Sequence, residues 1–463
     1  MKIKIHSNKI VTILLIILMI FSGTGFVSIA KTNDEFDFII ITPSDFSEEL
    51  LPLLTHKENL GISTKIITLD DIYESIYFPV NGRDAPEQIK YFIKNAIEFW
   101  NTEYVLLVGG KDIMPVRYTR IYYGHDNYTY YISDLYFADI YFSNNSFCSW
   151  DTNNDNIFAD KNKSGYIDEV DLYPDVYLGR ILTNTKSQLN TVIDKIITYE
   201  NTAYGKDWFK NLIVCGGDDP RVAAFEIILP FLLKRFGFPV FEGEFLGNKA
   251  AKILSDFNAK KIYASGLIRP FIKALTITNI NAAINKGAGF IMFVGHGNID
   301  SAIHTNFPFF NTIWLPKPSG YNASDMQNLQ NEEKLPVGVF LGCLCGDFNE
   351  TDSPIAWEFI GYENGGFIAS FACTSGAQYI VSSLCSESLH GHMGLGIFRS
   401  YKQGNDITGK LWDESIRNFL NDEKALELGD AFSMLNWKNK LSNHYVIEQW
   451  TLFGDPTLKI GGY

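Results

Sequence analysis

Short runs of almost wholly apolar residues, alternating with helical patterns, most constrain the fold of this 463-residue chain. Continuous apolar runs suit strands of a parallel sheet that are buried on both faces. A strand–helix–strand alternation places helices on both sides of such a sheet. The sequence therefore predicts a three-layer α/β/α fold with a mostly parallel sheet. The expected strands lie at residues 36–42, 63–69, 104–110, 175–181, 211–218, 289–294, 337–341 and 367–371. The expected helices lie at residues 46–61, 85–100, 186–204 and 222–236.

The first thirty residues have the composition of a secretory signal peptide. Lysines at positions 2, 4 and 9 precede an apolar run at 10–21, and small residues follow around Ala30. This run is short for a membrane span, which favours a signal peptide at residues 1–30 over an uncleaved anchor. We therefore expect a secreted or cell-surface protein with no membrane span after cleavage.

The remaining chain divides into two parts in the sequence pattern. An N-terminal α/β subdomain is expected at 31–204, with a polar, aromatic-rich insertion at 118–171, and a second subdomain at 205–463. Loss of the three leader lysines takes the formal net charge from −14 to −17. Such an acidic chain lacks the basic surface that nucleic-acid binding needs, so nucleic-acid partners are excluded.

Two short motifs directly follow two of the expected strands. Gly295-His296-Gly297 follows the run at 289–294, and Gly342-Cys343-Leu344-Cys345-Gly346 follows the run at 337–341. In open parallel α/β sheets, active sites form outside the carboxyl ends of the strands. The sequence therefore predicts that the histidine and a cysteine meet at one edge of the sheet.

The chemistry of this pair is that of a thiol nucleophile and its base. An imidazole can assist formation of the Cys343 thiolate and later protonate the leaving amine. The backbone N–H groups of Gly297 and Cys343 are candidate oxyanion-hole donors. Each motif also has a plainer explanation, because Gly-His-Gly can be a strand-end bend and a buried cysteine is usually an apolar filler.

Longer motifs give the chain a specific resemblance to the gingipain-type cysteine peptidases, family C25 of the caspase-like clan. These motifs run in the family's order over nearly the whole chain: Ile41–Pro43, Tyr104–Gly110, Pro174–Arg180, Gly295–Gly297, Cys343–Phe348 and Trp450–Leu458. The resemblance implies a caspase-like fold of two fused subdomains and a catalytic reaction without a cofactor. It also implies Cys343, rather than Cys345, as the nucleophile. Asp218 matches the family's acid that orients the histidine, although Asp218 also suits a helix N-cap.

The resemblance is weakest at the pocket for the substrate side chain that precedes the cleaved bond (P1). Arginine-specific members carry an acid early in the helix after the Asp218 turn, where this chain has Val222 beside Arg221. The opposite wall is expected from the segment after the strand at 367–371. Its candidate residues are Thr374, Ser375, Gly376, Ala377 and Tyr379. The P1 preference therefore stays open.

The insertion carries a pattern typical of a structural calcium loop. Residues 160–171 have oxygen ligands at positions 1, 3 and 5, a glycine at position 6 and an acid at position 12, as in an EF-hand loop. The candidate ligands are Asp160, Asn162, Ser164, Tyr166 and Asp171, with Asp151, Asn153 and Asp155 just before them. A hydrophilic surface turn is the alternative, since Asn and Asp favour turns.

Together these features predict a secreted cysteine endopeptidase. It would hydrolyse protein or peptide substrates through a Cys343 thioester, with His296 as general base and acid. The alternatives are a catalytically silent relative that binds peptides at the cell surface, and an acyl-transfer enzyme that uses the same thioester.

Overall fold

One mixed sheet organises the chain from Glu35 to Tyr463. The computed structural model describes residues 35–124, 127–162, 165–217, 242–264, 273–304, 320–380, 383–435 and 442–463. The expected signal peptide, Asp218, Val222 and the expected helix at 222–236 lie outside the described residues. Within the described residues, eleven strands form the sheet, in the order β11-β10-β9-β12-β16-β17-β18-β8-β3-β1-β2.

The strands of this sheet confirm the apolar runs of the sequence, with ends shifted by a few residues. Those from the N-terminal part are β1 (Phe38–Thr42), β2 (Thr64–Thr68), β3 (Tyr104–Val108) and β8 (Tyr177–Ile181). Those from the C-terminal part are β9 (Asn211–Gly216), β10 (Asn258–Tyr263), β11 (Lys273–Ala274), β12 (Phe290–Val294), β16 (Val337–Leu341), β17 (Ala369–Cys373) and β18 (Trp450–Phe453). All residues of β1, β12, β16 and β17 are buried, as central parallel strands require.

The C-terminal strand β18 lies between the two groups of strands. It pairs antiparallel with β17 and parallel with β8, whereas the other pairs of the sheet are parallel. Strands of both predicted subdomains therefore belong to one sheet, and the strands on the two sides of the β17–β18 pair run in opposite directions. The mostly parallel sheet that the sequence predicts is confirmed.

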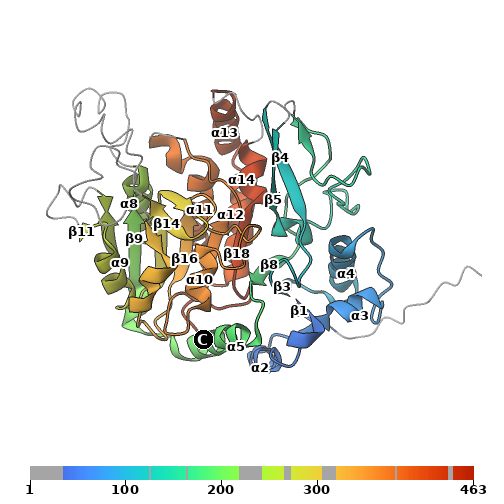
Figure 1. Cartoon of the computed structure of the whole chain (residues 1–463), viewed down its shortest axis with the longest axis horizontal. Helices are drawn as coiled ribbons and strands as arrows, with labels where there is room; N and C mark the ends of the chain where they lie inside the picture. Colours follow the sequence, from blue (N-terminus) through green and yellow to red (C-terminus); the bar gives the residue numbers. More distant parts are fainter. Residues whose placement is uncertain are drawn as a thin grey trace, which may run out of the picture. The chain divides into compact units, whose positions relative to one another are not determined.

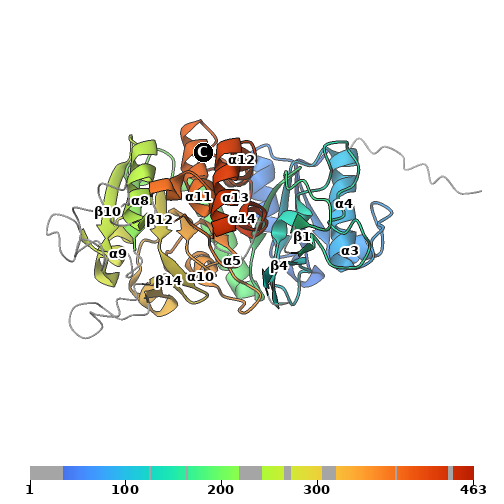
Figure 2. The ribbon, with the colours of Figure 1, turned by 90° about the horizontal axis from the view of Figure 1, so that it is seen from above.

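Helices cover both faces of the sheet, which confirms the three-layer arrangement (Figure 2). On one face lie α8 (Glu242–Ile253), α11 (Leu389–Lys402) and α12 (Thr408–Leu420). On the other lie α5 (Lys186–Thr202), α9 (Ile277–Ile284) and α10 (Ile355–Gly361). The N-terminal part adds α2 (Leu51–Asn59), α3 (Leu69–Tyr73) and α4 (Ala85–Trp100), and the C-terminal part ends with α13 (Glu423–Leu435) and α14 (Ser442–Glu448), as Figure 1 shows.

Local sequence signals explain where several of these helices begin. The Asp84 side chain accepts a hydrogen bond from the Glu87 N–H at 3.0 Å and so caps α4, with Pro86 in the first turn. Thr185 caps α5 in the same way. Among the described residues, no helix combines the length and the apolar composition needed to cross a membrane.

Part of the insertion is buried, whereas its segments 143–146 and 152–156 are exposed. It forms the hairpin β4 (Tyr118–Gly124) and β5 (Asn127–Ile132), the short helix η2 (Asp134–Phe137) and the small hairpin β6 (Lys161–Asn162) and β7 (Gly165–Tyr166). All four residues of η2 are buried, because this helix packs on α4 and on the sheet. This buried part of the insertion therefore belongs to the core of the molecule.

Candidate active site

Three neighbouring strands end level with one another at the edge of the sheet. The last residues of β9, β12 and β16, which are Gly216, Val294 and Leu341, lie opposite each other. In the sequence, a candidate catalytic residue follows two positions after the end of each strand. His296 and Cys343 are therefore brought to the same edge, as the sequence predicts. Asp218 would stand at the equivalent position after β9, but it lies outside the described residues.

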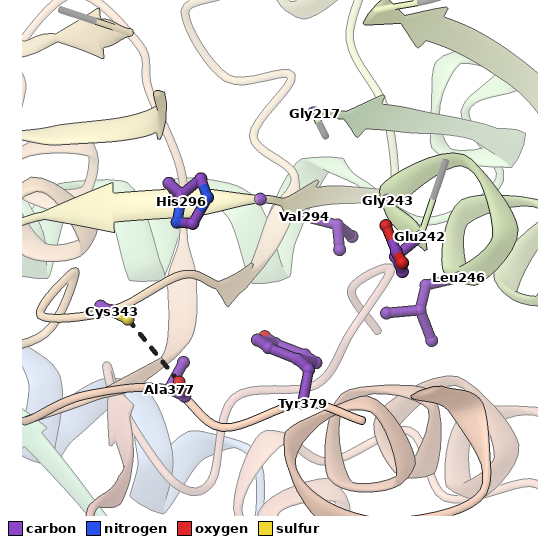
Figure 3. A pocket seen from close by; sticks show the side chains of 10 residues that line it. Gly217, Glu242, Gly243, Leu246, Val294, His296, Cys343, Ala377 and Tyr379 are labelled. Atoms are coloured by element: carbon purple, nitrogen blue, oxygen red, sulfur yellow. Dashed lines mark hydrogen bonds between the residues drawn. The ribbon is translucent and has the colours of Figure 1, made fainter. Parts of the chain in front are cut away.

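His296 and Cys343 line one pocket at this edge (Figure 3). The pocket has a volume of about 240 Å³. Its walls come from the ends of β9 and β12, the first turn of α8, the turn after β16 and the segment after β17. The lining residues are Gly217, Glu242, Gly243, Leu246, Val294, Gly295, His296, Cys343, Ala377 and Tyr379.

Cys343 differs from the other cysteines of the chain in its accessibility. All six cysteines lie in the described part of the chain and are free, and Cys343 alone among them is not fully buried. Its Sγ donates a weak hydrogen bond to the Ala377 carbonyl at 3.6 Å. Burial also raises the pKa of the Cys343 thiol. The thiol is therefore protonated at rest, and a base must remove its proton before attack.

The turn that carries Cys343 is held by backbone hydrogen bonds to the segment after β17. Leu344 has a left-handed backbone with φ of 60°, which is strained for a branched side chain. Its N–H donates to the Ser375 carbonyl at 2.9 Å, and the Gly346 N–H donates to the Cys373 carbonyl at 2.9 Å. Cys345 points into the interior and is 1% exposed. Cys343 is thus the cysteine of this turn that reaches the pocket.

His296 starts the short strand β13 (His296–Asn298), which pairs with β14 (Ser301–His304). Its ring is exposed at the mouth of the pocket. The next residue must be a glycine, because a Cβ on Gly297 would lie 2.5 Å from the Cys345 sulfur and 2.7 Å from the Cys343 carbonyl oxygen. The histidine strand and the nucleophile turn therefore touch through backbone atoms.

Comparison with models of known protein families assigns the chain to a family. The model of the family described as Peptidase family C25 matches residues 31–461. The chain belongs to peptidase family C25. The caspase-like fold that the sequence resemblance implies is thereby confirmed.

Individual relatives of this C25 chain are distant. Gingipain R2 of Porphyromonas gingivalis is 21% identical over 429 residues, which cover 91% of this chain and 45% of that protein. Gingipain R1 of the same organism is 22% identical over 429 residues, with 91% and 34% covered. The chain thus spans less than half the length of these relatives. The crystal structure of the Arg specific cysteine proteinase gingipain R shares the fold, with a TM-score of 0.62, 18% identity and coverage of 92% and 78%.

The expected pocket wall of this C25 chain divides into an exposed and a buried part. Ala377 and Tyr379 line the pocket. Thr374 and Ser375 are buried behind it, and the Thr374 hydroxyl donates to the Ile132 carbonyl of the insertion at 2.6 Å. Gly376 donates its N–H to the Tyr445 hydroxyl at 2.8 Å. The structure therefore brings two of the five residues to the pocket and the other three to its support.

Sequence reasoning missed the three residues that α8 contributes to the pocket, which are Glu242, Gly243 and Leu246. Glu242 is the first residue of this helix and Leu246 lies one turn later, and both line the pocket (Figure 3). The sequence placed the helix that follows the turn at 222–236, so the acid at 242 was assigned no role. An acidic residue at a helix start, Glu242-Gly243-Glu244, was the available signal.

The candidate calcium ligands are only partly described. Ser164 and the side chains of Asn162 and Tyr166 lie outside the described residues. Asp160 accepts a hydrogen bond from Arg120 Nε at 2.7 Å, and Asp151 pairs with Arg83. Among the side chains that are described, no group of three His, Cys, Asp or Glu is arranged to hold a metal ion. Two predicted ligands are thus already neutralised by arginines, and calcium binding stays a prediction.

Proposed function

We propose that this chain is a cysteine endopeptidase in which Cys343 attacks the peptide carbonyl and His296 is the base. One observation carries the proposal: two adjacent strands in register, β12 and β16, supply an accessible thiol and an exposed imidazole to the same pocket. A module that only bound peptides would need neither group. Membership of family C25 supports the same reaction class.

The reaction follows from the state of the thiol. Because burial keeps Cys343 protonated at rest, His296 takes the proton as the sulfur approaches the carbonyl carbon. The developing oxyanion is stabilised by the N–H groups of Gly297 and Cys343. Collapse of this intermediate breaks the C–N bond, and His296 returns the proton to the leaving amine. Water, activated by His296, then hydrolyses the thioester. Asp218 would accept from the imidazole and fix its orientation.

The pocket supports a preference for a positively charged P1 side chain. Glu242 contributes a carboxylate, while Leu246, Val294 and Tyr379 contribute apolar surface. A long side chain with an apolar stem and a cationic head, such as arginine or lysine, satisfies both parts of this lining. The solved relative with the same fold is an Arg specific cysteine proteinase, which supports this preference.

Peptide cleavage by the purified protein tests the reaction. We expect Cys343→Ala and His296→Ala each to lower kcat/KM by roughly 10⁴-fold without a matching loss of folding. Cys148→Ala is the control, since this cysteine of the insertion is buried and does not line the pocket. A wild-type protein that cleaves no peptide in a diverse library, and whose Cys343 resists a thiol-reactive peptide probe, would contradict the proposal.

The P1 preference has its own test. Glu242→Gln keeps the shape of the side chain and removes its charge, so kcat/KM for arginine or lysine at P1 should fall by roughly 100-fold. Cleavage after a neutral residue should change little. Glu387→Gln is the control, because this nearby glutamate pairs with Lys249 and does not line the pocket. Equal losses for charged and neutral P1 residues would exclude Glu242 as the specificity residue.

Acyl transfer and hydrolysis pass through the same thioester, and their products distinguish the two reactions. Adding an amine such as glycinamide to the peptide reaction distinguishes the two outcomes. Free carboxylate products support hydrolysis, whereas dominant capture by the amine at low concentration would favour a transpeptidase.

Structural calcium in the insertion and export by the N-terminal segment complete the proposed function. The side-chain oxygens of Asp151 and Asn153 both accept from the Asp155 N–H, at 3.0 and 2.9 Å, so they converge inside one loop. Calorimetric titration should detect calcium binding that Asp155→Ala weakens and Asp112→Ala, outside the loop, does not. Absence of binding and of any calcium-dependent rise in Tm would remove calcium from the proposal. Detection of the chain in the medium, without residues 1–30, tests export.

A further inference from the structure

A buried polar junction supports the pocket wall from behind. The Tyr445 hydroxyl, on α14, accepts the Gly376 N–H at 2.8 Å and donates to the Ser375 hydroxyl at 2.8 Å. Gln449 Nε2 donates to the Gly376 carbonyl at 3.1 Å. Tyr445 is 0% exposed, so its hydrogen bonds compete with no solvent. The end of the chain thus holds Gly376 through both its backbone N–H and its carbonyl, and Ser375 through its side chain.

The same wall holds the nucleophile. The Ser375 carbonyl accepts from the Leu344 N–H at 2.9 Å, and the Ala377 carbonyl accepts from Cys343 Sγ at 3.6 Å. Leu344 has the strained left-handed backbone, and such a conformation persists only where its surroundings fix it. The wall segment that Tyr445 contacts at Ser375 and Gly376 therefore orients the Cys343 sulfur and holds the shape of the turn that carries it.

On its far side, the junction reaches the insertion. The ring of Tyr131 meets that of Tyr445 edge to face, with centroids 5.1 Å apart. The Tyr131 hydroxyl donates to Glu448, and Lys161 pairs with the same carboxylate while donating to the Tyr131 hydroxyl at 3.1 Å. Lys161 and Glu448 are both fully buried. Glu448 lies three residues after Tyr445, one turn along α14.

A buried ion pair contributes little net stability by itself. Replacing such a pair with apolar residues of similar size is often neutral or stabilising, whereas its directional hydrogen bonds fix one arrangement of the groups around it. In this molecule the pair lies at the end of a chain of contacts that leads through Tyr445 to the wall segment 375–377, whose carbonyls contact the Leu344 N–H and the Cys343 sulfur. Its location therefore points to positioning.

We propose that Tyr445 is a positioning residue for the nucleophile, and that the Lys161–Glu448 pair makes the insertion part of the active site by fixing Tyr445. This inference rests on the proposed peptidase function, because it assigns Tyr445 a role in that reaction. Tyr445 touches no reacting atom and acts through Ser375, Gly376 and the turn of Cys343.

Tyr445→Phe is the direct test, with Tyr199→Phe as a matched control. Tyr199 is also fully buried, and its hydroxyl also accepts a backbone N–H, that of Gly461, at 3.0 Å. We expect Tyr445→Phe to lower kcat by about 10- to 100-fold with KM changed less than about threefold, as for a small misplacement of a reacting group. The control should leave kcat unchanged even where it lowers Tm equally. Equal effects of the two variants on kcat would overturn the proposal.

Alkylation of Cys343 by iodoacetamide separates this inference from the proposed function. Mass spectrometry follows the reaction at one accessible cysteine and needs no peptidase activity. Tyr445→Phe should slow it and shift its pH profile, whereas Tyr199→Phe should not. If wild-type protein cleaves no peptide, the proposed function fails, and the alkylation rates still decide the positioning role. Ser375→Ala, which removes one hydrogen bond from the same chain, replaces Tyr445→Phe if that variant does not fold.

The ion pair is tested by a double-mutant cycle. Lys161→Met alone leaves a buried carboxylate without its cation and should slow Cys343 alkylation several-fold. Lys161→Met combined with Glu448→Gln removes both charges, so the alkylation rate should return toward that of the wild type. A double variant no faster than Lys161→Met, in protein with unchanged Tm, would show that the pair does not act through Tyr445.

Discussion

The two halves of the sheet use the carboxyl ends of their strands in opposite ways. In the C-terminal half, β9, β12 and β16 end at an open pocket that holds His296 and Cys343. In the N-terminal half, the end of β8 is closed by a buried salt bridge between Arg180 and Asp134, at 2.7 and 2.6 Å. Arg180 also donates to the Gly109 carbonyl at the end of β3, at 3.0 Å.

This contrast shows that the carboxyl ends of parallel strands form a pocket only where the surrounding segments leave them uncovered. Because β17 and β18 are antiparallel, the carboxyl ends of the two halves lie at opposite edges of the sheet. The insertion delivers η2, and with it Asp134, to the N-terminal half. The same insertion supports the catalytic half through contacts to Thr374, Tyr445 and Glu448. One edge is therefore filled and the other is supported and left open.

The largest effect on activity is expected at Gly297, where the backbone of the histidine strand lies against the nucleophile turn. In Gly297→Ala the new methyl group meets the Cys343 carbonyl at 2.7 Å, so the nucleophile turn must move. We expect kcat/KM to fall by roughly 10³-fold or more, because a displacement of about 1 Å already costs about 100-fold. Thermal melting measures separately how far the contact with the buried Cys345 sulfur lowers stability.

Ala302→Gly provides the control for this variant. Ala302 is the cross-strand partner of Gly297, so its change loosens the same hairpin without adding an atom at the nucleophile turn. It should keep most of the activity. A Gly297→Ala protein with wild-type kcat/KM would show that the backbone contact between the two catalytic segments is not needed.

At the closed edge, the expected effect is on stability and not on the thiol. Arg180→Met leaves Asp134 buried without its cation, which costs about 3–5 kcal/mol of unfolding free energy. Urea denaturation measures this loss. Arg180→Met combined with Asp134→Leu removes both charges and should recover part of it. A specific fall in the Cys343 alkylation rate, with stability unchanged, would break the division between the two edges.

The sequence predicted those parts of the fold that depend on local pattern. The eight predicted runs all became strands, of which β1, β12, β16 and β17 are buried along their whole length. His296 and Cys343 meet because β12 and β16 are neighbours in register. It did not predict that β18 joins the halves, since the four residues Trp450–Phe453 carry too little pattern to reveal a partner. Pairing between distant strands is a property of the whole chain.

The pocket was predicted only where the strands themselves deliver residues. Glu242 reaches it from α8, whose position depends on packing against β9 and α11, and no spacing in the sequence records that contact. Likewise the insertion reads as polar, because Lys161 and Asp134 are charged, yet both are buried against opposite charges. Burial of paired charges is decided by tertiary contacts, which composition does not contain.

The smallest expected effect concerns acid sensitivity, and it sharpens the comparison of the halves. On the catalytic side, α11 carries His390, whose pKa is lowered to about 3 by burial. Its Nδ1 accepts the Gln378 N–H at 2.8 Å, beside the pocket residue Tyr379. The ring is therefore neutral in the folded protein.

Linkage then fixes the direction of the pH dependence. Below pH 6.5 the unfolded state binds a proton at His390 that the folded state does not, so the free energy of unfolding falls as the pH falls from about 6.5 toward 3. The slope contributed by one such histidine is at most about 1.4 kcal/mol per pH unit.

His390→Asn keeps an acceptor for the Gln378 N–H and removes the titrating group. Urea denaturation at pH 7, 6 and 5 should therefore give a shallower pH dependence for His390→Asn than for the wild type. His392, with a pKa lowered to about 4, remains as the second titrating group on α11, so roughly half of the joint effect should persist. An unchanged slope would mean that His390 does not contribute to the acid sensitivity and that other buried groups, such as His392, carry it.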